Sequence, residues 1–351
     1  MVISRRPKIF CQFLARPTLE PQSGDRINEI RFYRALSSFA DVYYNDTLID
    51  WSIGAIGDPT GLNTPSRDYD LYYVRSNPSL FKSLPSPKIT MAYPYDREVF
   101  ERADAIAVTT EAWSQLLKEH ARSDAVRKKL AKWYPENIVL PERILNIQQT
   151  IDPTFIRKAP ERSVFEWRAR MTGALSFGFF GRVTDETLPN ELIDGLDVIR
   201  KRLGSKTSPL AAFAGSIRTS LPMPSISLGQ IPYNEMPNAL AACRGTLGQM
   251  CAESDYLGSG KVLDSIATGT PIVTRRNPVR DEQLGAAYPG TYNTREEALE
   301  ILWKLCTDEV AHSDIRACLA DRAKLFLPEA TGHRIQVSLE AAGLLRGQVR
   351  P

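Results

Sequence analysis

Short apolar runs alternate with amphipathic segments along the first 120 residues. The largely apolar run Lys8–Leu14 predicts a buried strand, and Asp41–Tyr44 begins a second strand. Between them Ile30, Tyr33 and Leu36 recur at helical spacing. A strand that is followed by a helix and another strand needs a crossover connection, so this order predicts a parallel sheet.

The same alternation continues through the rest of the first half. Further strands are predicted at Leu71–Val74, Lys88–Ala92 and Ala105–Val108. Thr110 follows the last of these and is a suitable N-cap for a helix that runs to His120.

A second cycle begins at Leu175, after a charged and irregular stretch from Asp152 to Met171 that we interpret as a linker. Strands are predicted at Leu175–Phe180, Leu210–Phe213 and Pro271–Thr274, with helices between them. We therefore predict an α/β protein with two Rossmann-like, doubly wound parallel-sheet domains. The expected domains are residues 1–160 and 161–330, and residues 331–351 are expected to form a C-terminal helix that crosses back to the first domain.

Composition narrows the function classes. The 351 residues are 43% hydrophobic and carry a net charge of +3, which supports buried cores but gives no reason to expect nucleic acid as a partner. No apolar run is long enough for a membrane span or fits a secretory signal. The five cysteines include no C-x-x-C pair, which argues against a disulfide framework and a structural zinc site and favours the cytoplasm. The three histidines, His120, His312 and His333, lie in polar segments, so we expect them to be exposed and expect neither a histidine triad nor a histidine-rich metal site.

One basic segment has two interpretations. Arg127, Lys128, Lys129 and Lys132 lie beside Trp133. The first interpretation is a solvated basic helix. The second is a patch that contacts an anionic acceptor or the inner face of a membrane as a peripheral site.

The strongest chemical signal lies between Glu253 and Val273. Gly258, Ser259 and Gly260 form a flexible turn that opens a short helix, and Gly269 and Pro271 end it. The N–H groups at the start of this helix, together with Lys261, predict a site for an anion such as a diphosphate.

Other polar residues extend this candidate site. Asp264 is suited to accept hydrogen bonds from two ribose hydroxyls, although an idle surface ion pair with Lys261 is the alternative. Gly181 and Arg182 follow an earlier strand of the same predicted sheet, where a guanidinium can bind phosphate. In the first domain, Gly24 and Asp25 lie on the first strand-to-helix loop, where glycine lets the backbone approach a substrate.

Three stretches in this order resemble one family. The segments Phe177–Leu196, Gly229–Cys243 and Gly258–Val273 resemble the donor domain of retaining GT-B glycosyltransferases of the family-four type, also called glycosyl transferases group 1. Ala103–Leu117 and Leu145–Ile156 are similar to the last strand of that family's N-terminal domain and to the segment before its interdomain crossover.

The resemblance implies a two-domain GT-B fold and the transfer of a hexose-type sugar from a nucleoside-diphosphate sugar with retention. It implies that Arg182 and Lys261 hold the donor diphosphate as the catalytic residues, that Asp264 replaces the family's ribose-binding glutamate, and that Gly24 lies near the acceptor and phosphates. It also implies that no metal or other cofactor is required, because cationic side chains and helix N-termini stabilise the leaving diphosphate.

The sequence departs from the family pattern at three places. Asp185–Leu188 stands where the family often has a lysine, Met91–Pro94 stands where it often has a histidine, and its paired-glutamate motif would begin at Tyr256. Two alternatives therefore stay open, namely a nucleotide-sugar-binding protein without catalysis and a GT-B nucleotide-sugar epimerase. The donor base, the sugar and the acceptor, whether glycan, lipid-linked or small molecule, are not identified by the sequence.

Overall fold

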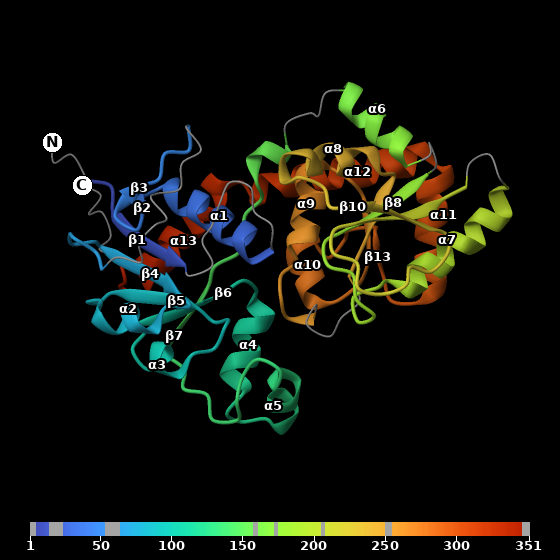
Figure 1. The fold of residues 1–351 in the computed structure, drawn as a ribbon. Coiled ribbons are helices and arrows are strands. Elements are labelled where there is room, and N and C mark those ends of the chain that lie inside the picture. The colour runs from blue at the N-terminus through green and yellow to red at the C-terminus, as the bar shows by residue number, and fades with distance from the viewer. Residues whose placement is uncertain are drawn as a thin grey trace. The chain divides into compact units, whose positions relative to one another are not determined.

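The computed structural model describes residues 5–13, 24–52, 64–156, 161–171, 175–204, 208–249 and 255–345. The chain divides into two compact units (Figure 1). Unit 1 comprises Met1–Thr150 and Pro328–Pro351, and unit 2 comprises Ile151–Leu327.

Unit 1 is built on a seven-stranded sheet with the order β3-β2-β1-β4-β5-β6-β7. Its strands are β1 (Lys8–Phe13), β2 (Asp41–Tyr44), β3 (Thr47–Leu48), β4 (Leu71–Arg75), β5 (Lys88–Met91), β6 (Ala105–Val108) and β7 (Arg143–Asn146). All neighbouring pairs are parallel except β2 and β3. These two strands form a tight hairpin through Asn45 and Asp46, whose φ angles of 49° and 65° suit the short polar side chains of asparagine and aspartate.

The helices of unit 1 are α1 (Gly24–Ser37), α2 (Pro78–Ser83), α3 (Arg97–Phe100), α4 (Glu111–Glu119), α5 (Asp124–Leu130) and α13 (Pro328–Ala341). Thr110 caps α4 as expected, since its side chain accepts a hydrogen bond from the N–H of Trp113 at 3.2 Å. The last helix, α13, packs on α1 (Figure 1). The contact is close at Gly332, where a Cβ atom would overlap the carbonyl oxygen of Ala35 and the side chain of Ser38.

Unit 2 is built on a fully parallel six-stranded sheet with the order β10-β9-β8-β11-β12-β13. The strands are β8 (Ser176–Phe180), β9 (Leu210–Ala214), β10 (Ser225–Gly229), β11 (Gly245–Leu247), β12 (Ile272–Arg275) and β13 (Thr291–Tyr292). The chain moves outward from β8 in one direction through β9 and β10, then returns to place β11 on the other side of β8. The strand order therefore reverses between β8 and β11, which is where open α/β sheets bind ligands at the carboxyl ends of their strands.

Helices cover both faces of this sheet. They are α6 (Glu161–Arg170), α7 (Asn190–Leu203), α8 (Met236–Ala242), α9 (Gly260–Thr268), α10 (Pro278–Leu284), α11 (Arg295–Thr307) and α12 (Glu309–Leu325), with short 3₁₀ turns at Pro153–Phe155 and Tyr233–Glu235. In Figure 1, α9 and α10 lie on one side of the sheet, and α7 packs against α11 on the other.

Helix α6 corrects one expectation. It occupies much of the charged stretch that we interpreted as a linker. Trp167 and Met171 are four residues apart on one face, and both are buried in the core of unit 2. Val164, one turn earlier and partly buried, packs against the same core, so three apolar residues at helical spacing anchor this largely polar helix.

The histidines also differ from expectation. His333 is exposed as expected and His312 is half-buried, but His120 is only 1% exposed. Both ring nitrogens of His120 are buried without a hydrogen-bond partner among the described residues. The polar residues around it in the sequence face solvent, while its own position at the end of α4 faces the interior.

Among the residues that the structure describes, no helix is both long and apolar enough to cross a bilayer.

The buried imidazole of His120 predicts a pH-dependent stability. Burial lowers the pKa of His120 below its usual value near 6.5, and the Arg127 guanidinium lowers it further. Because the unfolded chain takes up a proton near pH 6.5 and the folded chain does so only at lower pH, stability falls as the pH falls through 6.5, by up to about 1.4 kcal/mol per pH unit. Urea denaturation of His120→Gln at pH 7.5 and 5.5 should show a smaller difference than the parent protein. His333→Gln serves as the exposed control and should keep the parent's difference, and an unchanged difference in His120→Gln would contradict the assignment.

Candidate functional site

Three strands of the unit 2 sheet end in glycine at its carboxyl edge. Gly181, Gly215 and Gly229 stand at the ends of β8, β9 and β10 with φ angles of 130°, 118° and 69°, values that favour glycine. The N–H of Gly181 donates to Ala214 at 2.7 Å, and a Cβ at Gly215 would overlap the carbonyl oxygen of Gly181. These glycines leave bare backbone at the edge, where a ligand can approach closely.

Helix α9 begins next to this edge. The turn Gly258–Gly260 leads into it, and Ser259 is its N-cap without a capping bond from its own side chain. Gln283 holds the turn from behind, since its Oε1 accepts from the Ser259 N–H at 3.3 Å and its Nε2 donates to the Ser259 carbonyl at 3.2 Å. The buried Arg280 donates to the same Gln283 oxygen at 2.8 Å. The first N–H groups of a helix have no partner within the helix and carry a partial positive charge, so this supported turn suits an anion.

Lys261 extends across the point where the strand order reverses. Its Nζ donates to Oε1 of Gln249, just beyond β11, at 2.9 Å and lies 5.0 Å from the ring centroid of Phe179 in β8. Its Cε is 3.0 Å from where a Cβ of Gly181 would stand. The structure therefore brings Gly181 and Lys261 together. Sequence reasoning missed Gln249 because the short strand β11, which ends two residues before it, was itself not predicted.

Arg182 and Asp264 differ in their surroundings. Arg182 follows Gly181 and is exposed, and its guanidinium has no hydrogen bond or ion pair with any residue that the structure describes. Asp264 is only 8% exposed, so it does not lie on the solvent-facing side of α9. One turn further along α9, Thr268 donates through Oγ1 to the Asp264 carbonyl at 2.9 Å. The apolar side of α9 packs into the core of unit 2, where Val262, Leu263, Ile266 and Ala267 are all buried.

The candidate residues of unit 1 are only partly described. Gly24 is the first residue of α1, and a Cβ there would meet no atom within 4 Å, so the fold itself does not demand glycine. The side chain of Asp25 and the preceding residues 14–23 lie outside the described residues.

A buried ion pair lies further along α1 and was not anticipated from the sequence. Glu29 accepts from Nη1 of Arg75, the last residue of β4, at 2.6 Å, and the Tyr73 hydroxyl donates to the same carboxylate at 2.9 Å. Burial raises the pKa of Glu29, although Arg75 and Tyr73 oppose the shift. These bonds tie α1 to the carboxyl edge of the sheet. The pairing was not visible in the sequence because its partners are 46 residues apart.

The basic segment forms α5 and the turn after it. Arg127 is half-buried, pairs with Asp124 and donates to the carbonyls of His120 and Ala121. Trp133 is half-buried and packs edge-on against Tyr93 at 4.6 Å, with the Lys132 ammonium 4.9 Å from its ring. Lys128, Lys129 and Lys132 are the exposed cations of this segment. Among the described residues, no group of three or more histidine, cysteine, aspartate or glutamate side chains is placed to hold a metal ion.

Comparison with solved structures identifies the fold. Anabaena HepE in complex with UDP-glucose is similar to this chain with a TM-score of 0.63 and 14% identity, over 96% of this chain and 100% of HepE. Sucrose-phosphate synthase from Thermosynechococcus elongatus gives a TM-score of 0.61 and 12% identity over 95% of this chain and 98% of that enzyme. Trehalose-6-phosphate synthase from Burkholderia multivorans gives a TM-score of 0.52 and 11% identity over 78% of this chain and 72% of that enzyme. No family model and no curated protein matches the sequence. The two α/β sheets are thus those of the GT-B glycosyltransferase fold, which confirms the predicted fold class.

The glycine-lined edge can be tested directly. Gly215→Ala would place a methyl group against the Gly181 carbonyl and force a positive φ on alanine, so we expect the ends of β8 and β9 to separate. The free energy of unfolding should fall by about 1–3 kcal/mol. We also expect the backbone of Gly181, which contacts Lys261, to shift. Thermal denaturation measures the first effect. Gly204→Ala is the control, because its φ of 76° is also positive but a Cβ there meets no atom within 4 Å. Equal losses in the two variants would show that close packing at Gly215 is unimportant.

Proposed function

We propose that this protein is a glycosyltransferase that moves a sugar from a nucleoside-diphosphate sugar to an acceptor, with retention and without a required metal. The observation that carries the proposal is the position of Lys261, which lies beside Gly181 and Gln249 at the reversal of strand order, at the start of a helix. HepE, which has a similar fold, has been crystallised with UDP-glucose, which supports a nucleotide sugar as the donor.

In this proposal the diphosphate lies over the bare backbone at Gly181 and against the first turn of α9, including Gly258, Ser259 and Gly260. The side-chain oxygen Oε1 of Gln249 orients the Lys261 ammonium before any ligand binds. When the bond between the sugar and the diphosphate breaks, negative charge grows on the leaving oxygens. An oriented cation and a helix N-terminus stabilise that charge more strongly than they stabilise the intact donor.

Arg182 and Asp264 contribute in different ways. The exposed guanidinium of Arg182 is free to reach the diphosphate from the end of β8, in the manner of a second cation. Asp264 lies one turn inside α9, where its carboxylate is oriented by burial and accepts from ribose hydroxyls. We place the acceptor in unit 1, near Gly24, and extend the proposal to acceptors carried on a membrane surface through Lys128, Lys129 and Lys132.

The decisive experiment is incubation of the full-length protein with UDP-, GDP- and ADP-sugars. Release of the nucleoside diphosphate supports sugar transfer, including slow transfer to water. Recovery of an epimerised nucleotide sugar would replace the proposal with epimerase activity, and binding without turnover would replace it with a non-catalytic role.

Lys261→Ala should lose turnover more than donor affinity. Removing one oriented electrostatic group typically costs about 2.7–4 kcal/mol of transition-state stabilisation, so kcat should fall about a hundredfold to a thousandfold. Steady-state kinetics of nucleotide release measures this effect. Lys201→Ala is the control because Lys201 is an exposed lysine on α7 that pairs only with its neighbour Asp197 at 2.6 Å. Parent-like kcat in Lys261→Ala would remove the central support of the proposed mechanism.

Asp264→Asn should instead raise KM. A carboxylate that accepts from ribose hydroxyls makes its contacts equally in the ground and transition states, so its loss of about 1.5–3 kcal/mol appears as weaker donor binding with little change in kcat. Calorimetric titration with the nucleoside diphosphate should show the same loss of affinity. Unaltered binding together with a reduced kcat would assign Asp264 to the chemical step.

A further inference from the structure

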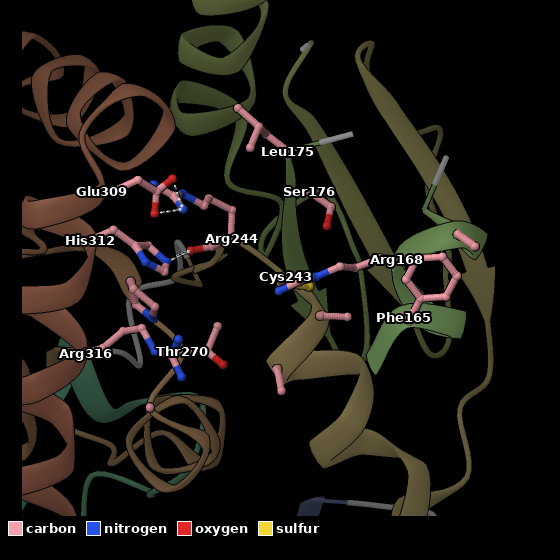
Figure 2. Close-up of a pocket in the computed structure, with 15 residues that line it drawn as sticks. Phe165, Arg168, Leu175, Ser176, Cys243, Arg244, Thr270, Glu309, His312 and Arg316 are labelled. Carbon is pink, nitrogen blue, oxygen red and sulfur yellow. Dashed lines mark hydrogen bonds and ion pairs between the residues drawn. The ribbon is translucent and has the colours of Figure 1, made fainter. Parts of the chain in front are cut away.

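A second site lies at the opposite edge of the unit 2 sheet. A cavity of about 740 Å³ opens at the amino ends of three strands, where Ser176, Arg244 and Thr270 line it. Helices α6, α8 and α12 supply most of its remaining walls (Figure 2). Gly181 and Gln249, by contrast, lie beyond the carboxyl ends of β8 and β11, so the two sites are at opposite ends of the same strands.

Cations outnumber anions in this cavity. Arg168, Arg244 and Arg316 line it together with His312, and Glu309 is the one carboxylate among the described lining residues. Figure 2 shows Arg168 reaching into the cavity from α6 and Arg316 from α12, from opposite sides. Both of these arginines are exposed and neither makes a hydrogen bond or ion pair with any other described residue.

Arg244 is oriented at the base of the cavity. Its Nε donates to the carbonyl of Leu305 and its Nη1 pairs with Glu309 at 2.8 Å. Its Nη2 is buried, and no described residue accepts a hydrogen bond from it. His312 donates from Nε2 to the Arg244 carbonyl at 3.0 Å, which places the imidazole beside this guanidinium. A buried donor without a partner costs stability, so the arrangement favours a ligand that supplies an acceptor.

The surrounding charges act on the titratable groups of the cavity. Burial lowers the pKa of His312, and the Arg244 and Arg316 guanidinium groups lower it further, whereas Glu309 opposes them. Burial raises the pKa of the Cys243 thiol to about 12, and the positive charge of Arg168 opposes this rise. These groups therefore share one positively charged space.

The ends of α8 and α9 point their last carbonyl groups toward this edge, and cations near helix C-termini are favourable. That effect favours cations at this edge but supplies no hydrogen-bond acceptor for Nη2 of Arg244. The rest of the lining is apolar. Phe165 is 72% exposed on α6, and Leu175 and Pro271 complete an apolar wall.

We propose that this cavity binds a small phosphate monoester whose organic part is apolar. The three guanidinium groups and the Glu309 carboxylate leave two positive charges in excess, which match a phosphate dianion. Each guanidinium also presents a planar set of donors to the phosphate oxygens. The apolar wall around Phe165 and Leu175 receives the organic group. The cavity volume lies within the range of small-molecule sites. This site does not depend on the function proposed for the carboxyl edge.

Calorimetric titration of the full-length protein with phenyl phosphate tests the proposal, with benzyl alcohol as the uncharged comparison. We expect saturable binding of phenyl phosphate and none of benzyl alcohol at the same concentrations. Arg168→Gln and Arg316→Gln should each weaken binding about fivefold to tenfold, because each loses one charge-assisted contact at a partly solvated site. Lys261→Ala should bind phenyl phosphate as the parent does.

Two matched controls keep the result interpretable. Arg162→Gln is on α6 and Lys324→Gln is on α12, and each removes an exposed cation that pairs only with a carboxylate on its own helix. Parent-like affinity in both controls, with weaker binding in Arg168→Gln and Arg316→Gln, supports the site. Absence of saturable binding would overturn the proposal. Weaker binding in Lys261→Ala alone would also overturn it. A lower melting temperature with unchanged affinity in Arg168→Gln and Arg316→Gln would overturn it as well, because these arginines would then only stabilise the helix ends.

Discussion

The close backbone contact between the ends of β8 and β9 is the constraint on which the carboxyl edge of unit 2 depends. Gly215 leaves room for the Gly181 carbonyl, and Gly181 in turn leaves room for the aliphatic stem of Lys261. A side chain at Gly181 would crowd the side chain of Lys261, and one at Gly215 would displace the Gly181 backbone. The chemistry of the site therefore rests on the absence of side chains from the strand ends as much as on the charged groups that surround them.

Two side chains of α10 support the turn before α9. Gln283 pairs with both the N–H and the carbonyl of Ser259, and Arg280 holds Gln283 in place while being only 2% exposed. The turn before α9 is flexible by composition, because two of its three residues are glycines. The two buried side chains of α10 restrict it, which lets backbone N–H groups face an anion without an entropic cost at the moment of binding.

Local patterns in the sequence were sufficient for the fold class and for the neighbourhood of α9. Alternating strands and helices predicted two doubly wound sheets, and the glycines at 258 and 260 predicted the start of the helix that carries Lys261. Long-range features were not predictable. The burial of His120, the Glu29 and Arg75 pair and the place of Gln249 depend on contacts between distant segments, which no local pattern of apolar and polar residues encodes. Helix α6 was missed for a different reason, since only Val164, Trp167 and Met171 mark its buried face in a mostly charged stretch.

Two elements join the two edges of the unit 2 sheet. Helix α9 has Lys261 in its first turn and ends at Gly269, which lines the basic cavity, and β11 runs from the residue after Arg244 toward Gln249. Nine helical residues span only about 14 Å at 1.5 Å per residue, and the helix is packed on its apolar side, so we expect it to respond to a ligand as one rigid element. A displacement of its C-terminal end by a ligand in the cavity would therefore reach Lys261 with little loss. Any such coupling must act equally in both directions, because the effect of one ligand on the affinity for the other is a single free energy.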